Sequence, residues 1–220
     1  MLGEAIGRNA LLLGLFAIVS TAIISGTFLG SEEKIQQNVR LAEEQALLEI
    51  IPRGQHNNSM LDDAHPIDDA PQLGLRSEKR YYIARQDTIP VAVIIPATAR
   101  DGYSGDIDMI IGINVNGSVA GVRVLSHRET PGLGDAIDRK KSDWIDGFTD
   151  KSLVNPTTDL WHVKKDKGVF DQFTGATITP RAVTQTVLQS LQYFDKHQHQ
   201  LLNPQSYSVT KKPNTSEAQR

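Results

Sequence analysis

An uncharged apolar segment near the N-terminus constrains this chain more than any other feature. Residues 9–31 carry no charged side chain and are dominated by Ala, Leu, Ile, Val and Phe. At a rise of about 1.5 Å per residue, roughly 20 helical residues cross a hydrocarbon core about 30 Å thick. The segment therefore predicts a transmembrane helix, and the rest of the chain is expected to fold as an attachment to it.

A cleaved signal peptide is the alternative interpretation of the same segment. Its apolar stretch is typically about 7–15 residues long and ends at a small-residue cleavage site. Here the stretch is longer, and it continues into Glu32 and Glu33 without a clear Ala-x-Ala site, so we expect the anchor to be retained. Arg8 precedes the span and two acids follow it. The positive-inside bias therefore places a short head, residues 1–8, in the cytoplasm and the remaining chain outside.

The segment after the span, residues 32–75, is predicted to be a stalk helix followed by a polar loop. Apolar residues at helical spacing continue the helix to about residue 51: Ile35, Val39, Ala42, Ala46 and Ile50. Residues 55–75 are polar and rich in turn formers, which indicates a long surface loop. The polar tail, residues 204–220, is expected to be disordered.

The body, residues 76–203, begins with patterns typical of strands. Residues 81–84 and 91–95 are β-rich runs, the second closed by Pro90 and Pro96. Alternate apolar positions follow: Ile107, Met109, Ile111, Ile113 and Val115. Asn116-Gly117 then predicts a two-residue hairpin turn, in which both central residues need positive φ. The return strand is expected over residues 119–126, with Val122 and Val124 on one face.

A helix is predicted to begin at Thr179. Thr is a favourable N-cap, and Pro180 suits the first helical position, where no amide donor is needed. An apolar stripe at helical spacing follows: Val183, Val187, Leu188, Leu191 and Phe194. Strands followed by a helix, without regular βαβ alternation, predict the α+β class: one domain of antiparallel strands and flanking helices.

Composition excludes several classes of function. The chain contains no cysteine, so disulfides, thiolate metal sites and cysteine nucleophiles are absent. Its formal net charge is −3 and its basic residues form no block beyond short pairs, which argues against nucleic-acid binding. No catalytic triad is evident, and we expect neither a catalytic group nor a metal site of the chain's own.

Residues 171–180 form the first of two segments whose residue types suit a chemical role. Gly175 and Ala176 leave the backbone around Thr177 open to close approach. The adjacent helix N-terminus offers unpaired amides and the positive end of a dipole, which favour a phosphate group. A tight turn leading into a capped helix is the alternative interpretation, and the local pattern alone favours it.

Residues 127–135 form the second such segment. Gly132 and Gly134 lie in a constrained turn directly after the predicted hairpin. Such a turn can bring backbone amides close to a planar ligand. An ordinary surface turn explains the local pattern equally well.

Together these two segments resemble a known family. Thr174-Gly175-Ala176-Thr177 preceded by Asp171 resembles the flavinylation motif of the covalent-FMN-binding domain family, and residues 129–134 (Glu-Thr-Pro-Gly-Leu-Gly) match its second hallmark. With Gly-Tyr-Ser-Gly at 102–105, the hairpin, Lys-Ser-Asp-Trp at 141–144 and the anchor, the resemblance extends from about residue 9 to 194. It is closest to the G subunits of Rnf/Rsx ion-translocating electron-transport complexes.

The resemblance implies a bacterial inner-membrane electron-relay subunit with its domain on the periplasmic side. FMN would be joined through its phosphate to Thr177 by a separate Mg²⁺-dependent transferase that uses FAD. The residues implied for transferase recognition are Asp171, Thr174, Gly175 and Ala176, the last three also lying beside the cofactor. Those implied to line the flavin ring are Glu129, Thr130, Gly132, Leu133 and Gly134. The implied partners are that transferase and the other membrane subunits of the complex.

Two alternatives stay open at this point. The equivalent flavin subunit of the sodium-translocating NADH:quinone reductase shares both hallmarks, although the total length and the Trp-containing segments favour the Rnf/Rsx family. A flavin-free binding module on a membrane stalk is the alternative from a different class.

Overall fold

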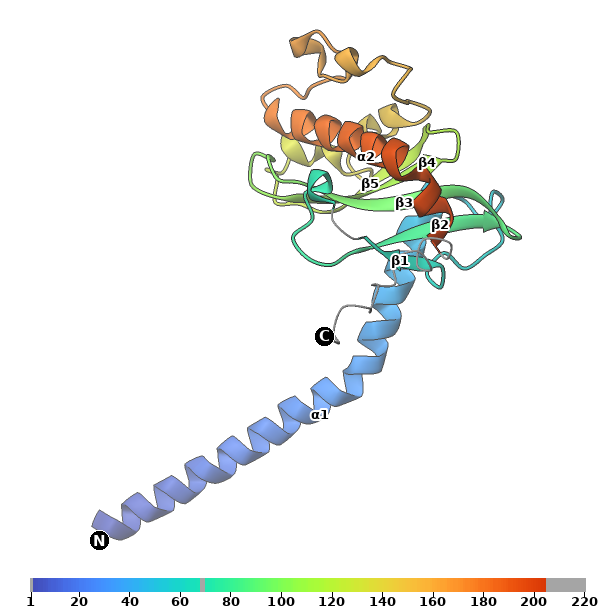
Figure 1. Cartoon of the computed structure of the whole chain (residues 1–220). Helices are drawn as coiled ribbons and strands as arrows, with labels where there is room; N and C mark the ends of the chain where they lie inside the picture. The colour runs from blue at the N-terminus through green and yellow to red at the C-terminus, as the bar shows by residue number, and fades with distance from the viewer. Residues whose placement is uncertain (1, 68–69, 205–220) are drawn as a thin grey trace, which may run out of the picture. The chain divides into compact units, whose positions relative to one another are not determined.

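The computed structural model describes residues 2–67 and 70–204 (Figure 1). It divides into two compact units, residues 1–45 and 46–220. The first unit is helical, and the second contains the sheet and the remaining elements. The prediction of a disordered tail concerns residues 204–220, of which all but Pro204 lie outside the described residues.

Helix α1 runs without interruption over Leu2–Ile50. It includes residues 2–8 of the predicted head, the whole predicted span and the predicted stalk helix as far as Ile50. Among the described residues, one helical segment, Gly7–Gly26, is long and apolar enough to cross a membrane by length and composition. Its large apolar side chains, including Leu13 and Phe16, are exposed in the structure. A helix that is apolar on every side requires an apolar surrounding, as a membrane provides.

The second unit confirms the predicted α+β class. Within the described part of this unit, five strands form one antiparallel sheet in chain order: β1 (Ala64–Pro66), β2 (Arg80–Gln86), β3 (Ile89–Ala99), β4 (Ile107–Asn114) and β5 (Val119–Ser126). Helix α2 (Ile178–Leu202) packs against β3 and β4, as the red-orange helix across the sheet in Figure 1 shows.

The strand pattern gives the sheet two buried faces. Alternate side chains of β4, such as Ile107 and Ile111, join a core with the apolar stripe of α2. Ile110 points to the opposite face, where it packs in a second cluster with Leu47 and Ile50 at the end of α1. Full burial of one such side chain contributes about 1.5–3 kcal/mol. Both faces therefore stabilise the sheet that carries the site.

The predicted loop at residues 55–75 is only partly irregular. It contains β1 and the 3₁₀ helix η1 (Pro71–Leu73), whose Leu73 is fully buried. Strand β1 is a three-residue strand that pairs with β2 at the edge of the sheet. Short edge strands that contain Pro or polar residues lack the alternation on which strand prediction depends.

The hairpin between β4 and β5 is confirmed, but its predicted two-residue turn is wrong. The amide of Asn114 donates to the carbonyl of Ser118 at 2.8 Å, so that three residues, 115–117, form the loop. Gly117 has a φ of 83°, whereas Asn116 does not adopt a positive φ. A three-residue loop of this kind needs one left-handed residue rather than two. Val115, predicted to face inward, is correspondingly exposed.

The two prolines expected to close the second strand lie inside β3 instead. Pro90 is near its start. Pro96 lies beyond Ile94, the last residue of β3 that pairs with β2, so β3 is an edge strand at that point. Proline lacks an amide donor and is tolerated where a strand has no partner on one side.

The chain between β5 and α2 has little regular structure. It contains four short 3₁₀ helices: η2 (Gly134–Ile137), η3 (Trp144–Phe148), η4 (Thr158–Leu160) and η5 (Lys164–Asp166). An aromatic cluster holds this segment to the core. The rings of Phe148 and Phe170 stack with centroids 4.6 Å apart, and buried Trp161 lies 5.0 Å from Phe170. This segment carries both sequence motifs.

Candidate functional site

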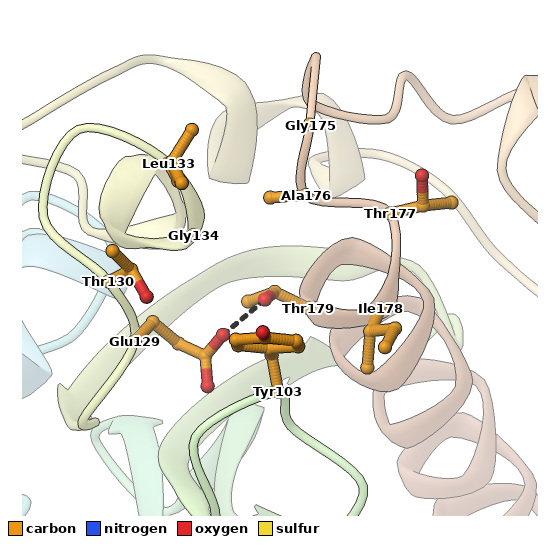
Figure 2. Close-up of a pocket in the computed structure, with 10 residues that line it drawn as sticks. All are labelled: Tyr103, Glu129, Thr130, Leu133, Gly134, Gly175, Ala176, Thr177, Ile178 and Thr179. Atoms are coloured by element: carbon orange, nitrogen blue, oxygen red, sulfur yellow. Dashed lines mark hydrogen bonds between the residues drawn. The ribbon is translucent and has the colours of Figure 1, made fainter.

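The two motif segments, which lie far apart in the sequence, line one cavity. It has a volume of about 340 Å³ and lies at the N-terminus of α2 (Figure 2). Its lining residues come from the loop before β4, the loop after β5, the loop before α2 and the first turn of α2: Tyr103, Glu129, Thr130, Leu133, Gly134, Gly175, Ala176, Thr177, Ile178 and Thr179. The volume falls in the range of small-molecule sites.

Thr177 occupies the N-cap position of α2, with a φ of −86° and no side-chain capping hydrogen bond. The first-turn amides of a helix lack acceptors within the helix, and they carry the positive end of its dipole. Figure 2 shows the Thr177 hydroxyl directed away from the space between Leu133 and Ala176. The residue is half-buried. Its hydroxyl is therefore placed for access by another molecule.

The prediction that Thr179 caps the helix is wrong. Helix α2 begins at Ile178, and Thr179 is fully buried. Its hydroxyl donates a short hydrogen bond to Oε2 of Glu129 (Figure 2). Pro180 is accommodated within the first turn of the helix because first-turn residues need no intrahelical donor. The threonine thus joins two segments rather than terminating one.

Glu129 is the central polar group of the cavity wall. Its side chain is only 4% exposed. Besides the Thr179 hydroxyl, it accepts a hydrogen bond from the backbone amide of Ser104 at 2.8 Å through Oε1. One carboxylate therefore connects the loop before β4, the loop after β5 and helix α2. A buried carboxylate is tolerated when donors satisfy its oxygens.

The loop after β5 is held by hydrogen bonds of its own. The amides of Leu133 and Gly134 donate to the carbonyl of Thr130 at 3.1 Å, and the Gly132 amide donates to Oδ1 of Asp135 at 2.7 Å. Asp135 is buried. These contacts fix a compact turn that directs Leu133 toward the cavity.

The loop before α2 is anchored at its beginning. The indole Nε1 of Trp144 donates to the carbonyl of Asp171 at 2.8 Å, and the Trp144 ring meets Phe173 edge to face at 5.1 Å. The Asp171 carboxylate forms an exposed ion pair with Lys164 at 2.6 Å. These anchors lie before Gly175, which is itself exposed.

The structure brings together most of the residues expected at the site. Seven of them line the cavity: Glu129, Thr130, Leu133, Gly134, Gly175, Ala176 and Thr177. Gly132, Thr174 and Asp171 do not. Three lining residues were not predicted: Tyr103, Ile178 and Thr179. The available signal for Tyr103 was the Gly-Tyr-Ser-Gly segment at 102–105, which forms part of the family resemblance.

Comparison with known proteins identifies the family. Residues 102–192 match the FMN-binding domain model, and residues 1–50 match the RnfG N-terminal region model. Relatives named as the G subunit of an ion-translocating oxidoreductase complex include a Pseudomonas aeruginosa protein that is 46% identical over 90% of this chain and 92% of its own. A Vibrio cholerae protein is 44% identical over 90% of this chain and 95% of its own length. The chain belongs to the RnfG family of ion-translocating oxidoreductase subunits.

Membership in the RnfG family confirms the resemblance seen in the sequence. The FMN-binding domain match contains every residue that lines the cavity. The N-terminal region match coincides with α1 and its apolar segment. This member of the RnfG family is thus a membrane-anchored protein with an FMN-binding domain.

A test of the loop geometry in this domain is the substitution Gly175→Val. Gly175 has a φ of 78°, a conformation that costs a branched residue about 1–2 kcal/mol. The nearest atom to an added Cβ would be Cδ2 of Leu133 at 3.6 Å, so backbone strain rather than crowding is the expected cause. We expect the amount of bound flavin to fall sharply while the circular dichroism spectrum stays near that of the wild type.

The matched control is Gly54→Val, at a glycine with open space and no left-handed φ. It should load flavin normally. Normal loading of the Gly175→Val protein would show that the loop conformation is not needed for flavin loading.

Proposed function

We propose that this chain carries FMN joined through its phosphate to Thr177 and relays electrons between other subunits of a membrane complex. The observation that carries the proposal is the cavity itself. Two hallmark segments and the N-terminus of α2 converge on it, and Thr177 lies at its rim. The family assignment provides independent support.

The residues present fit FMN in three respects. The first-turn amides of α2 favour a phosphate group beside Thr177. Leu133 and Ile178 supply apolar surface of the kind that a planar ring system needs. Gly175 and Ala176 leave room for close approach between these two parts. The phosphate and the ring are thereby assigned to neighbouring regions of one site.

The attachment step is a transfer from FAD by a separate Mg²⁺-dependent transferase. The Thr177 Oγ attacks the phosphorus on the FMN side of the pyrophosphate. An Oγ–P bond forms, the P–O bond to AMP breaks, and AMP leaves with the electron pair. The hydroxyl proton passes to a base. A Thr hydroxyl is a weak nucleophile, so activation by the transferase is required.

The protein's own contribution after attachment is placement. When bound, FMN supplies the capacity to accept and release electrons. Glu129 holds the three segments of the wall together through its bonds to Ser104 and Thr179. Leu133 and Ile178 exclude water from part of the site. The covalent tether keeps the cofactor from dissociating on a side of the membrane without a ready flavin supply.

Peptide mass spectrometry of the protein from its native membrane tests this proposal directly. We expect the peptide that contains Thr177 to carry an added mass of FMN minus water. The adduct on Thr174 or Thr179 would contradict the assignment of the attachment residue. Protein that carries no flavin, despite the presence of its transferase, would instead support a flavin-free binding module.

A prediction about topology follows from the charge distribution around the span. Arg8 precedes it and acids follow it, so we expect the domain on the periplasmic side of the bacterial inner membrane. Protease added to intact spheroplasts should digest the domain, and the mature protein should keep Met1 or Leu2 at its N-terminus. Protection in spheroplasts together with digestion in inverted vesicles would show the opposite orientation.

A further inference from the structure

The largest aromatic surface at the cavity belongs to a residue without an assigned role. Tyr103 is 68% exposed, and it lines the cavity together with Leu133 and Ile178, which are 44% and 45% exposed. A single exposed apolar residue is ordinary on a protein surface. Three that border one cavity form an apolar rim on which a planar ligand can pack.

The orientation of the Tyr103 ring suits such a ligand. In Figure 2 the ring is seen nearly edge-on, with one face turned toward the space that Leu133 and Ala176 border from the other side. Aromatic rings pack favourably in an offset parallel arrangement. A planar ring system inserted into this space would have the phenol on one face and the Leu133 side chain near the other.

The loop that carries Tyr103 is held in place. The Ser104 amide donates to Oε1 of buried Glu129 at 2.8 Å, which links the loop to the Thr179 hydroxyl on α2. At Gly102 an added Cβ would lie 2.2 Å from the carbonyl oxygen of Gly105, so the loop closes tightly on itself. An exposed side chain on a fixed loop is pre-organised for contact with a ligand.

We propose that Tyr103 is a positioning residue that stacks on the flavin ring of FMN. The Glu129 carboxylate holds the loop that carries Tyr103 in place. This inference rests on the proposed function. The phosphate is fixed at Thr177 on one side of the cavity, so the ring has to be oriented by the opposite side. Tyr103 and the loop after β5 provide that side. The stacked phenol shields one face of the ring from solvent.

Fluorescence of the loaded full-length protein in detergent distinguishes this role from a merely structural one. An electron-rich phenol in contact with flavin quenches its emission, whereas a phenyl ring covers the flavin without that quenching. Tyr103→Phe should therefore raise flavin emission several-fold and leave quenching by added iodide unchanged. Tyr103→Leu should raise both the emission and the iodide quenching, because the ring face becomes accessible.

The matched control is Tyr82→Phe, on the sheet face that carries the second cluster. It should change neither the flavin emission nor the iodide quenching.

The intact mass of every protein is determined first. Wild-type and variant proteins with a full FMN adduct but equal emission and equal iodide quenching would overturn the stacking of Tyr103 and leave the attachment at Thr177 intact. Absence of the adduct from the wild-type protein would overturn both.

Discussion

Replacing Thr177 by Ala is expected to abolish the flavin fluorescence that survives denaturing electrophoresis, while the domain stays folded. The substitution removes the only atom to which the phosphate is proposed to bond. It should cost little stability, because the Thr177 side chain makes no capping hydrogen bond. A Thr-to-Ala change costs about 1 kcal/mol only where the hydroxyl caps the helix. In-gel fluorescence and circular dichroism measure the two outcomes separately.

The neighbouring threonines make this prediction specific. Thr179 is fully buried with its hydroxyl bonded to Glu129, so it is closed to an enzyme. Thr174 is exposed and is the real competitor. Thr158→Ala, at an exposed threonine in η4, serves as the matched control and should retain full fluorescence. Covalent flavin that persists in the Thr177→Ala protein would contradict the assignment.

The fold was largely predictable where local pattern determines structure. Alternating apolar residues in β4 and the apolar stripe of α2 indicated a buried face in each element. Both elements are present, although β4 ends before Val115 and α2 is not capped by Thr179. Strand β1 was missed because an edge strand of three residues has no periodicity to detect. The hairpin was predicted correctly, but Asn116-Gly117 is compatible with more than one loop length.

The two segments that form the site could be predicted from the sequence. The contacts that join them in the wall of the cavity could not. The sequence suggests that Thr179 is a helix cap, since a Thr-Pro pair at the start of an apolar stripe is typical of one. Its actual partner, Glu129, lies 50 residues earlier, and no local rule relates the two. The contribution of Tyr103 depends in the same way on the bond between Ser104 and Glu129. Contacts between residues so far apart in the sequence depend on the complete fold.

Glu129→Ala is expected to lower the free energy of unfolding by about 2–3 kcal/mol, the cost of leaving donors without a charged acceptor. The Thr179 hydroxyl would be left buried without its acceptor, and the Ser104 amide would lose its bond to the wall. The three segments around the cavity would then be held less firmly, so flavin loading should fall as well. Urea unfolding of the full chain in detergent, followed by emission of Trp144 and Trp161, measures the stability.

Glu129→Gln separates hydrogen bonding from charge. The amide oxygen can accept from the Ser104 amide, and the amide nitrogen can donate to the Thr179 oxygen, which reverses the direction of that bond. The shape of the side chain is retained. Stability within about 1 kcal/mol of the wild type is therefore expected. A loss as large as that of Glu129→Ala would show that the negative charge itself stabilises the wall.

A double-mutant cycle tests whether Glu129 and Thr179 act as one unit. Thr179→Val keeps the branched shape but removes the hydroxyl, so it should also destabilise the chain. If the two side chains stabilise the fold through their mutual bond, the double variant Glu129→Ala, Thr179→Val costs less than the sum of the single changes by about 1–2 kcal/mol. Additive effects would mean that each side chain acts through other contacts. In that case the Glu129 carboxylate would act through its bond to the Ser104 amide.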